Sequence, residues 1–312
     1  MEVISLGESG LKVSRLAMGC WTIGGHGWGG VHNEESILAV QYAFDSGVTF
    51  FDTADVYGFG HSEKVLRKAL GEHRKDVIIA SKFGVRWDRD GRTWKDISPR
   101  YMRQALEASL RRLRLECIPL YYVHWPDGRT PVTDIMGELA RCRDEGKILA
   151  IGVSNFSVAQ LEEAINVADV HAVQVQFNVI DRGRATEVLP LCLLYGIPLV
   201  TWGSLADGLL TGKFDEHTRF TKYDHRRRNL NFQGKYLLQN LKLVNLLRTM
   251  AEKRNGTIAQ FALRWLLDTP GVGSVIFGAR RPEQVKENIG SLGWTLTTNE
   301  YKMVEALSTS CK

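Results

Sequence analysis

The chain has 312 residues, of which 44% are hydrophobic, and this is enough to bury a substantial core in one large domain. No linker rich in proline, glycine or serine divides it, so a single domain over residues 1–312 is predicted. The formal net charge is a modest +5, and the basic residues are scattered apart from Arg226-Arg227-Arg228. This pattern excludes a nucleic-acid-binding protein, which would carry a basic stripe, and favours an anionic small molecule as the ligand.

The five cysteines are odd in number, widely spaced and without a CxxC pair. They indicate reduced thiols in a cytoplasmic protein, with no zinc site. The first residues carry no basic segment followed by a long apolar run, and no apolar stretch reaches the roughly 18 residues that a membrane helix needs. We therefore expect no signal peptide, no membrane contact and no bound metal.

In chain order, the first elements are two short segments, 2–6 and 11–15, on either side of the turn signal Glu8-Ser9-Gly10, and they predict a β-hairpin. Strands and helices then alternate. The predicted strands cover residues 15–19, 48–52, 77–82, 118–123, 148–153, 172–177, 197–202 and 273–277. The predicted helices cover residues 33–46, 61–71, 99–114, 132–145, 158–168, 184–195, 235–254, 258–268, 282–291 and 297–308. Eight strands, each followed by a helix, predict an α/β protein with a (β/α)8 TIM barrel behind the hairpin, rather than an open doubly wound sheet.

Side chains that can cap a helix mark several of these starts. Asn33 is predicted to cap the first helix, Ser98 the helix that begins at 99, and Ser157 the helix that begins at 158. Thr257 and Gln260 form a capping-box pattern for the helix at 258–268.

The loop at 203–233, after the seventh barrel strand, is long for a compact domain. In a barrel it lies at the catalytic face, so we expect an irregular loop that folds over a ligand. Its basic run, 222–228, has two interpretations: contact with a cofactor or an anionic substrate, or a solvated loop. The solvated loop is the favoured interpretation.

The segment Gly25-His26-Gly27-Trp28-Gly29-Gly30 fits the G-x-G-x-x-G pattern of a Rossmann dinucleotide site, with Asp52 as the ribose-binding acid. We reject that interpretation because the glycines begin six residues after the predicted strand ends, and because Trp28 stands where the backbone must approach a pyrophosphate. A flexible loop over the barrel mouth is the alternative. Trp21 and Trp28 are then available to line a substrate pocket.

Three successive strands end in residues that can carry charge, namely Asp52, Lys82 and His124. A buried carboxylate needs a cation or several donors, so Lys82 is the expected partner of Asp52. Tyr57 follows Asp52 by five residues. The ammonium of Lys82 would lower the pKa of the Tyr57 phenol, and His124 would position a substrate oxygen that Tyr57 then protonates.

Each of these residues also has an ordinary structural interpretation: a helix-capping Asp52, a core histidine at His124 and a surface lysine at Lys82. Their occurrence at consecutive strand ends favours a common site. No metal cluster or activated serine or cysteine is visible in the sequence, so a hydride from a nicotinamide is the natural reaction partner of such a proton donor.

Several ordered segments resemble the signature segments of the aldo-keto reductases over nearly the whole chain. They are Asp52-Thr53-Ala54-Asp55-Val56-Tyr57-Gly58, Ser81-Lys82, His124-Trp125-Pro126-Asp127, Gly152-Val153-Ser154-Asn155-Phe156 and Gly208-Leu209-Leu210-Thr211-Gly212-Lys213. Within that family, the chain resembles the bacterial branch that includes IolS-like reductases, which is also similar to the potassium-channel β-subunits.

The resemblance implies a catalytic tetrad of Asp52, Tyr57, Lys82 and His124, with Tyr57 as the acid, and NADPH bound across the barrel mouth without a Rossmann fold. It implies cofactor contacts from Ser154, Asn155, Gln176, Trp202, Ser204, Leu205, Lys213, Gly278, Arg280, Gln284, Glu287 and Asn288. Among these, Arg280 would take the adenosine 2′-phosphate, which favours NADPH over NADH. Trp202 is equally well explained as a core aromatic, and Arg280-Arg281 as an exposed pair at a helix start.

The activity implied is reduction of an aldehyde or ketone to an alcohol. Trp21, Trp28, Trp87 and Trp125 suggest an aromatic-walled substrate pocket, and the resemblance points weakly to a sugar or cyclic polyol carbonyl. The alternative is a nicotinamide-sensing regulatory subunit like the channel β-subunits, which keep the same tetrad. The oligomeric state is open, because no exposed apolar stripe stands out.

Overall fold

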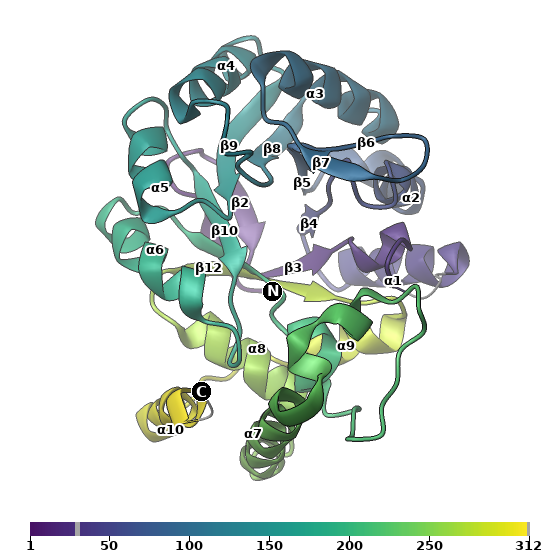
Figure 1. Cartoon of the computed structure of the whole chain (residues 1–312), viewed down its shortest axis with the longest axis vertical. Helices are drawn as coiled ribbons and strands as arrows, with labels where there is room; N and C mark the ends of the chain where they lie inside the picture. Colours follow the sequence, from purple (N-terminus) through teal and green to yellow (C-terminus); the bar gives the residue numbers. More distant parts are fainter. Residues whose placement is uncertain (29–31, 311–312) are drawn as a thin grey trace.

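The computed structural model describes residues 1–28 and 32–310, and its central feature is a closed barrel of parallel strands (Figure 1). The neighbours around the barrel run in the order β10, β11, β12, β3, β4, β5, β8 and β9. These strands are β3 (Leu16–Gly19), β4 (Phe50–Asp52), β5 (Ile78–Phe83), β8 (Ile118–Val123), β9 (Ile148–Ser154), β10 (Ala172–Gln176), β11 (Leu199–Trp202) and β12 (Val272–Gly278). The predicted (β/α)8 barrel is confirmed.

Helices surround the barrel on its outer side (Figure 1). They are α1 (Asn33–Asp45), α2 (His61–Leu70), α3 (Pro99–Leu113), α4 (Val132–Asp144), α5 (Val158–Ile165), α6 (Gly183–Leu194), α7 (Gly234–Glu252), α8 (Ile258–Asp268), α9 (Pro282–Ile289) and α10 (Thr298–Ser310). No helix in the described ranges is both long and apolar enough to cross a membrane.

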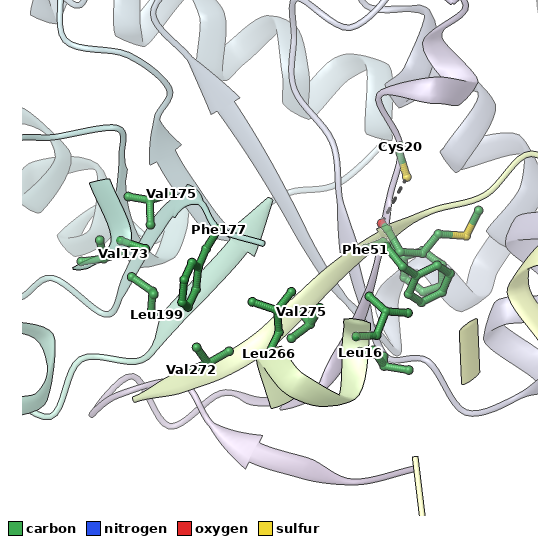
Figure 2. Packing of buried hydrophobic residues seen from close by; sticks show 14 of the residues in the cluster. Leu16, Cys20, Phe51, Val173, Val175, Phe177, Leu199, Leu266, Val272 and Val275 are labelled. Atoms are coloured by element: carbon green, nitrogen blue, oxygen red, sulfur yellow. Dashed lines mark hydrogen bonds between the residues drawn. The ribbon is translucent and has the colours of Figure 1, made fainter. Parts of the chain in front are cut away.

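Two apolar layers hold the barrel together. The outer layer lies between strands and helices, where Leu266 of α8 packs near Val272 and Val275 of β12 (Figure 2). The inner layer fills the barrel, where Phe50, Leu120 and other inward-facing side chains are fully buried. Burial on both faces explains why these strands appear in the sequence as continuous apolar runs.

The N-terminal hairpin closes one end of the barrel. Strands β1 (Val3–Ser5) and β2 (Lys12–Ser14) pair in antiparallel fashion, and Leu6 and Val13 are fully buried in the inner apolar layer. Ser14 and Thr49 exchange hydrogen bonds of 3.1 Å between side chains and backbone just before β4 begins, so the hairpin lies at the N-terminal ends of the strands. The opposite end of the barrel stays available for a site.

Most predicted helix starts are confirmed, and one is wrong. The side chains of Ser98, Ser157 and Thr257 each accept a backbone hydrogen bond at the start of α3, α5 and α8. Asn33 is instead the first residue of α1, whose N-cap His32 makes no side-chain capping bond. The Asn33 side chain is 2.8 Å from the His61 ring and links α1 to the start of α2, so it is not available as a cap.

Sequence reasoning missed one hairpin and simplified one loop. Strands β6 (Val85–Trp87) and β7 (Thr93–Lys95) form an antiparallel hairpin directly after β5. The loop 203–233 is not irregular throughout, because it contains three short 3-10 helices, η3 (Ala206–Thr211), η4 (His225–Arg228) and η5 (Leu230–Phe232). An isolated β-bridge between Trp28 and Asp224 joins this loop to the loop after β3. Of the G-x-G-x-x-G segment, Gly29 and Gly30 lie outside the described residues.

A glycine inside the barrel provides a test of this packing. A Cβ on Gly152 of β9 would lie 2.3 Å from the buried ring of Tyr122, so we expect Gly152→Ala to destabilise the protein by about 1–3 kcal/mol, the usual effect of overpacking. Urea unfolding monitored by fluorescence measures the change. The matched control is Gly137→Ala within α4, where nothing lies within 4 Å of the new methyl group. That variant should gain about 0.5–1 kcal/mol from the lower entropy of the unfolded chain, and equal effects of the two substitutions would contradict the packing described here.

Candidate active site

A cavity of about 700 Å³ lies at the C-terminal ends of the barrel strands. Residues that follow most of the barrel strands line it, together with the β6–β7 hairpin and the loops 20–28 and 203–233. A (β/α)8 barrel normally carries its active site at this end, because every strand delivers a side chain there. The predicted tetrad residues Asp52, Tyr57 and His124 line the cavity, and Lys82 lies directly behind Asp52 and Tyr57.

Lys82 and Asp52 form a buried ion pair at the base of the cavity. The Lys82 ammonium donates to Asp52 Oδ1 at 2.5 Å and to the Thr53 carbonyl at 2.8 Å, and it lies 3.5 Å from the Tyr57 hydroxyl. The second Asp52 oxygen accepts a hydrogen bond of 2.7 Å from Gln174. The Lys82 side chain has no exposed surface, which excludes a surface lysine. Each charge is therefore compensated, as burial requires.

The protonation of Tyr57 differs from the sequence-based expectation. Burial raises the pKa of Tyr57 well above its usual value, and the negative charge of Asp52 raises it further. The prediction of a net lowering of this pKa beside Lys82 is therefore wrong, because burial and Asp52 outweigh the effect of the ammonium. The physical reason is that a buried phenolate would lose its hydration and would lie near the Asp52 carboxylate, and both costs exceed the attraction of the Lys82 ammonium in the resting site. Tyr57 keeps its proton at neutral pH and is available as a donor.

His124 is a neutral imidazole. Burial lowers the pKa of His124 well below its usual value, and the charges of Lys82 and Lys95 lower it further. Its ring lies edge-on to Tyr57, with 5.7 Å between centroids, and within the described structure its Nδ1 atom has no hydrogen-bond partner. A neutral ring carries one N–H donor, so it can hold an oxygen near Tyr57 without adding a second charge to the site.

Asn155 joins three strand ends. Its amide donates to the His124 carbonyl at 3.0 Å and to the Ser154 hydroxyl at 2.9 Å, and its oxygen accepts from the Trp202 indole at 3.2 Å. Its backbone has a positive φ of 61°, a conformation that asparagine tolerates better than most residues. Asn155, Ser154 and Trp202 all line the cavity, and Trp202 is therefore not a plain core aromatic.

The two glutamines of β10 have different positions. Gln174, which was not predicted from the sequence as a site residue, lines the cavity and donates a hydrogen bond to Asp52. Gln176, which was predicted as one, is not among the lining residues described, and its amide lies 3.2 Å from Asp181. The register of β10 against β9 pairs Gln174 with Ser154. Because Ser154 was already predicted at the mouth of the barrel, this pairing is the feature that could have identified Gln174 as a site residue.

Four cations meet at one end of the cavity. Lys213, Arg226, Arg280 and Arg281 all line it. Burial lowers the pKa of Lys213, and repulsion from the three arginines lowers it further. An anion with several charges would relieve that repulsion.

Arg226 corrects the interpretation of the run 222–228 as a solvated loop. Its side chain is only 13% exposed and forms a 2.5 Å ion pair with Asp224. The guanidinium lies over the rings of Trp28, Phe214 and Phe220, at 4.7–5.6 Å from their centroids. Arginine stacks well on aromatic rings, and this is why one member of the run folds inward.

The remaining predicted site residues divide into two groups. Ser204, Leu205, Gly278, Gln284, Trp21, Trp28 and Trp125 line the cavity. Glu287, Asn288 and Trp87 are not among the lining residues described. The Trp87 ring is nevertheless close to the cavity, because its centroid lies 5.8 Å from that of Phe59, which does line it. Sequence reasoning missed His26, Glu35 and Phe59, which line the cavity from the loops after β3 and β4 and from the first turn of α1.

The arrangement defines a class of protein. A neutral phenol beside a buried ion pair and a neutral imidazole can give a proton to an oxygen that becomes basic during a reaction. The cationic end of the same cavity suits the phosphates of a nucleotide. In the described part of the chain, no group of three or more His, Cys, Asp or Glu residues could hold a metal ion. The fold, and the position of these groups at the C-terminal ends of the strands, are those of a (β/α)8-barrel enzyme.

Comparisons with known proteins identify the family. The model of the aldo/keto reductase family matches residues 15–309. Aldo-keto reductase YhdN of Bacillus subtilis is 37% identical over 98% of this chain and 93% of the relative. The chain therefore belongs to the aldo-keto reductase family and is an oxidoreductase that acts on carbonyl or CH–OH groups.

Other relatives show the range of this family. The NADH-specific methylglyoxal reductase of Escherichia coli is 31% identical over 98% of this chain and 99% of the relative. A probable voltage-gated potassium channel subunit beta of Arabidopsis thaliana is 35% identical over 93% of this chain and 90% of the relative. Among solved structures, the glycerol dehydrogenase AKR11B4 of Gluconobacter oxydans matches with a TM-score of 0.91 and 36% identity, over 99% of this chain and 95% of that one.

Proposed function

We propose that this protein reduces an aldehyde or ketone to an alcohol with NADPH, and that Tyr57 is the general acid. The observation that supports this most directly is the contact of the Tyr57 hydroxyl with a buried Lys82–Asp52 pair, in the same cavity that gathers four cations. A proton donor and a nucleotide-phosphate site in one cavity meet the two needs of such a reduction.

The residues present fit a nicotinamide dinucleotide. Lys213, Arg226 and Arg280 would hold its phosphates, and the open backbone at Gly278 leaves room, since a Cβ there would meet only Thr22 at 3.7 Å. Ser154 and Gln174 would face the nicotinamide end, where they flank the tetrad. When bound, the reduced nicotinamide supplies a hydride to the carbonyl carbon.

The chain's own groups then act on the carbonyl oxygen. The N–H of the neutral His124 ring would hold that oxygen beside the Tyr57 hydroxyl. Tyr57 stays protonated until negative charge develops on the oxygen, which is then basic enough to take the phenolic proton. The Lys82 ammonium, 3.5 Å away, favours the phenolate that remains after the transfer, and Asp52 keeps Lys82 charged and oriented.

Arg280 is the residue expected to distinguish NADPH from NADH. It lines the cavity at the start of α9, where an arginine can bind a phosphate bidentately. We expect Arg280→Met to raise the KM for NADPH by about 10- to 100-fold and to change the KM for NADH much less. This is the effect expected when hydrogen bonds from a charged donor to the phosphate are lost. Steady-state kinetics with both cofactors measure the ratio. An equal loss with NADH would contradict the assignment, as would an NADH preference in the wild-type protein like that of the Escherichia coli relative.

The substrate is proposed to be a small polar carbonyl compound, such as a 2-oxoaldehyde or a carbonyl derived from a sugar, polyol or cyclic polyol. Aromatic rings of Trp21, Trp125 and Phe59 supply walls of the cavity near Tyr57. The names of the methylglyoxal reductase and the glycerol dehydrogenase indicate small polar molecules of this kind for two relatives. The described cysteines Cys20, Cys117, Cys142 and Cys192 are all free thiols, as expected in a reducing cytoplasm, where we place the protein.

The test is to follow the loss of NADPH absorbance with a panel of short aldehydes, oxoaldehydes and sugars. Turnover by the wild-type protein, with the alcohol identified as the product, is the expected result. The relative described as a channel subunit favours one alternative, a regulatory subunit that binds the cofactor and biases a protein partner. Tight NADPH binding without turnover of any panel member would overturn the reductase proposal in favour of that role.

A further inference from the structure

His225 lies where the two loops that border the cavity, 20–28 and 203–233, meet. It begins η4 in the loop 203–233, and its ring packs against two tryptophans of the loop 20–28 that also contact each other. The distance between ring centroids is 4.8 Å to Trp21 and 4.4 Å to Trp28. Trp21 in turn stacks against Tyr57, with 6.1 Å between centroids and 27° between the ring planes. A single imidazole thus backs the aromatic wall that packs against the proposed acid.

The partners of His225 are all hydrogen-bond acceptors. The ring Nδ1 lies 2.8 Å from the Gly27 carbonyl, to which the His225 backbone N–H also donates at 2.9 Å. The ring Nε2 lies 3.2 Å from the Asp207 carboxylate, close enough for an ion pair although the angle is outside that of a good hydrogen bond. A carbonyl oxygen and a carboxylate can only accept, so both ring nitrogens must carry protons for the two contacts to attract.

Asp207 occupies an unusual backbone position. Both Ala206 and Asp207, the first residues of η3, have positive φ values, 48° and 55°. Conformations of this kind persist only where surrounding contacts hold them. The Asp207 carboxylate supplies such contacts, because it faces His225 and also accepts a 2.8 Å hydrogen bond from Asn229. It therefore connects the barrel end to the far part of the loop 203–233.

We propose that His225, as an imidazolium bound between the Gly27 carbonyl and Asp207, is a positioning residue that fastens the loop 203–233 onto the loop 20–28. The contact also holds the Trp21 ring against Tyr57. This role rests on the proposed function, because it concerns the wall of the same reductase site. His225 does not touch the reacting atoms and acts through Trp21.

The surrounding charges set the direction of the pH dependence. Asp207 of η3 and Asp224 of the adjoining segment face His225 as anions, while Arg226 and Arg280 lie over Trp28 as cations. The titratable groups of the loop 20–28 are His26, whose ring packs on Phe59, and the buried thiol of Cys20, whose pKa is raised by burial. Burial opposes the charged ring, but the contacts with Asp207 and Gly27 outweigh it and raise the pKa of His225.

The arrangement in which His225 holds the loop 203–233 against the loop 20–28 therefore binds the second imidazole proton of His225 more tightly than an arrangement in which the two loops are apart. It is fully favoured below the ordinary imidazole pKa of about 6.5, and its advantage is lost as the pH rises through the raised pKa.

Limited trypsin digestion tests the contact without reference to catalysis, because the basic run 222–228 offers cleavage sites inside the fastened loop. We expect His225→Gln to raise the cleavage rate in this run by about tenfold or more at neutral pH, as the loss of a charged donor predicts. The matched control is His217→Gln in the same loop, where the side chain is 82% exposed and the rate should not change. Asp207→Asn suits the left-handed backbone, and it should also raise the rate because the anionic partner is lost.

The pH profile of the KM for the carbonyl substrate is the second measurement. The KM of the wild-type protein should rise as the pH increases through the raised pKa of His225. His225→Gln should show a high KM at every pH, without this rise. Its kcat should stay within about twofold of the parent, because the substitution leaves the transition-state contacts intact. Equal cleavage of His225→Gln and His217→Gln would overturn the proposal. A wild-type protein without turnover would refute the proposed function alone, because the digestion still decides the role of His225.

Discussion

Tyr57→Phe is expected to reduce carbonyl turnover by at least about 100-fold, the usual contribution of a positioned general acid, while NADPH binding is retained. The substitution removes one oxygen and leaves the ring contacts with Trp21 and His124 in place. Lys82 loses only its 3.5 Å contact and keeps Asp52 and the Thr53 carbonyl, so the fold should not change. Steady-state kcat with an aldehyde, together with NADPH titration by protein fluorescence, measures both parts of the prediction.

The matched control is Tyr121→Phe on β8. The Tyr121 hydroxyl is buried and has no hydrogen-bond partner within the described structure, so its removal should leave turnover at the parental level. Reduction of aldehydes by Tyr57→Phe at the parental rate would contradict the assigned acid. Loss of NADPH binding in that variant would show instead that the phenol supports the cofactor site and not the proton transfer.

The barrel was predictable because the apolar runs carry most of the information about it. Strands such as β5 and β8 are buried on both faces, and a continuous apolar run of this length between turn signals is typical of a buried parallel strand. Helix starts were predictable where a side chain caps its own helix, as Ser157 does. The failure at Asn33 has a tertiary cause, since its side chain bonds His61 of a neighbouring helix, a contact that local sequence does not encode.

The site was predictable where strand ends define it and less so where loops do. Asp52 and Lys82 lie on neighbouring strands, so the barrel alone brings them together. The choice between Gln174 and Gln176 depends on how far along β10 the mouth of the barrel lies, and the sequence pattern Gln-Val-Gln places both side chains on the same face of the strand. The inward position of Arg226 depends on stacking with Trp28 and Phe220, which come from distant parts of the loops.

Lys82→Met is expected to destabilise the protein by about 3–5 kcal/mol and to abolish turnover, because it leaves the Asp52 carboxylate buried without its cation. Asp52 is then held by the Gln174 amide alone among its side-chain partners in the described structure. Urea unfolding gives the stability, and the m-value must stay constant for the comparison to hold. Turnover is lost for a separate reason, since no ammonium remains to favour the phenolate of Tyr57.

The double variant Lys82→Met, Asp52→Asn separates these two effects. Replacing the carboxylate by an amide removes the uncompensated charge and keeps an acceptor for Gln174, so most of the lost stability should return. Turnover should not return, because the charge that assists Tyr57 is still absent. Recovery of turnover together with stability would contradict the catalytic role of Lys82. A double variant no more stable than Lys82→Met would show that lost packing, and not an unpaired carboxylate, destabilises the single variant.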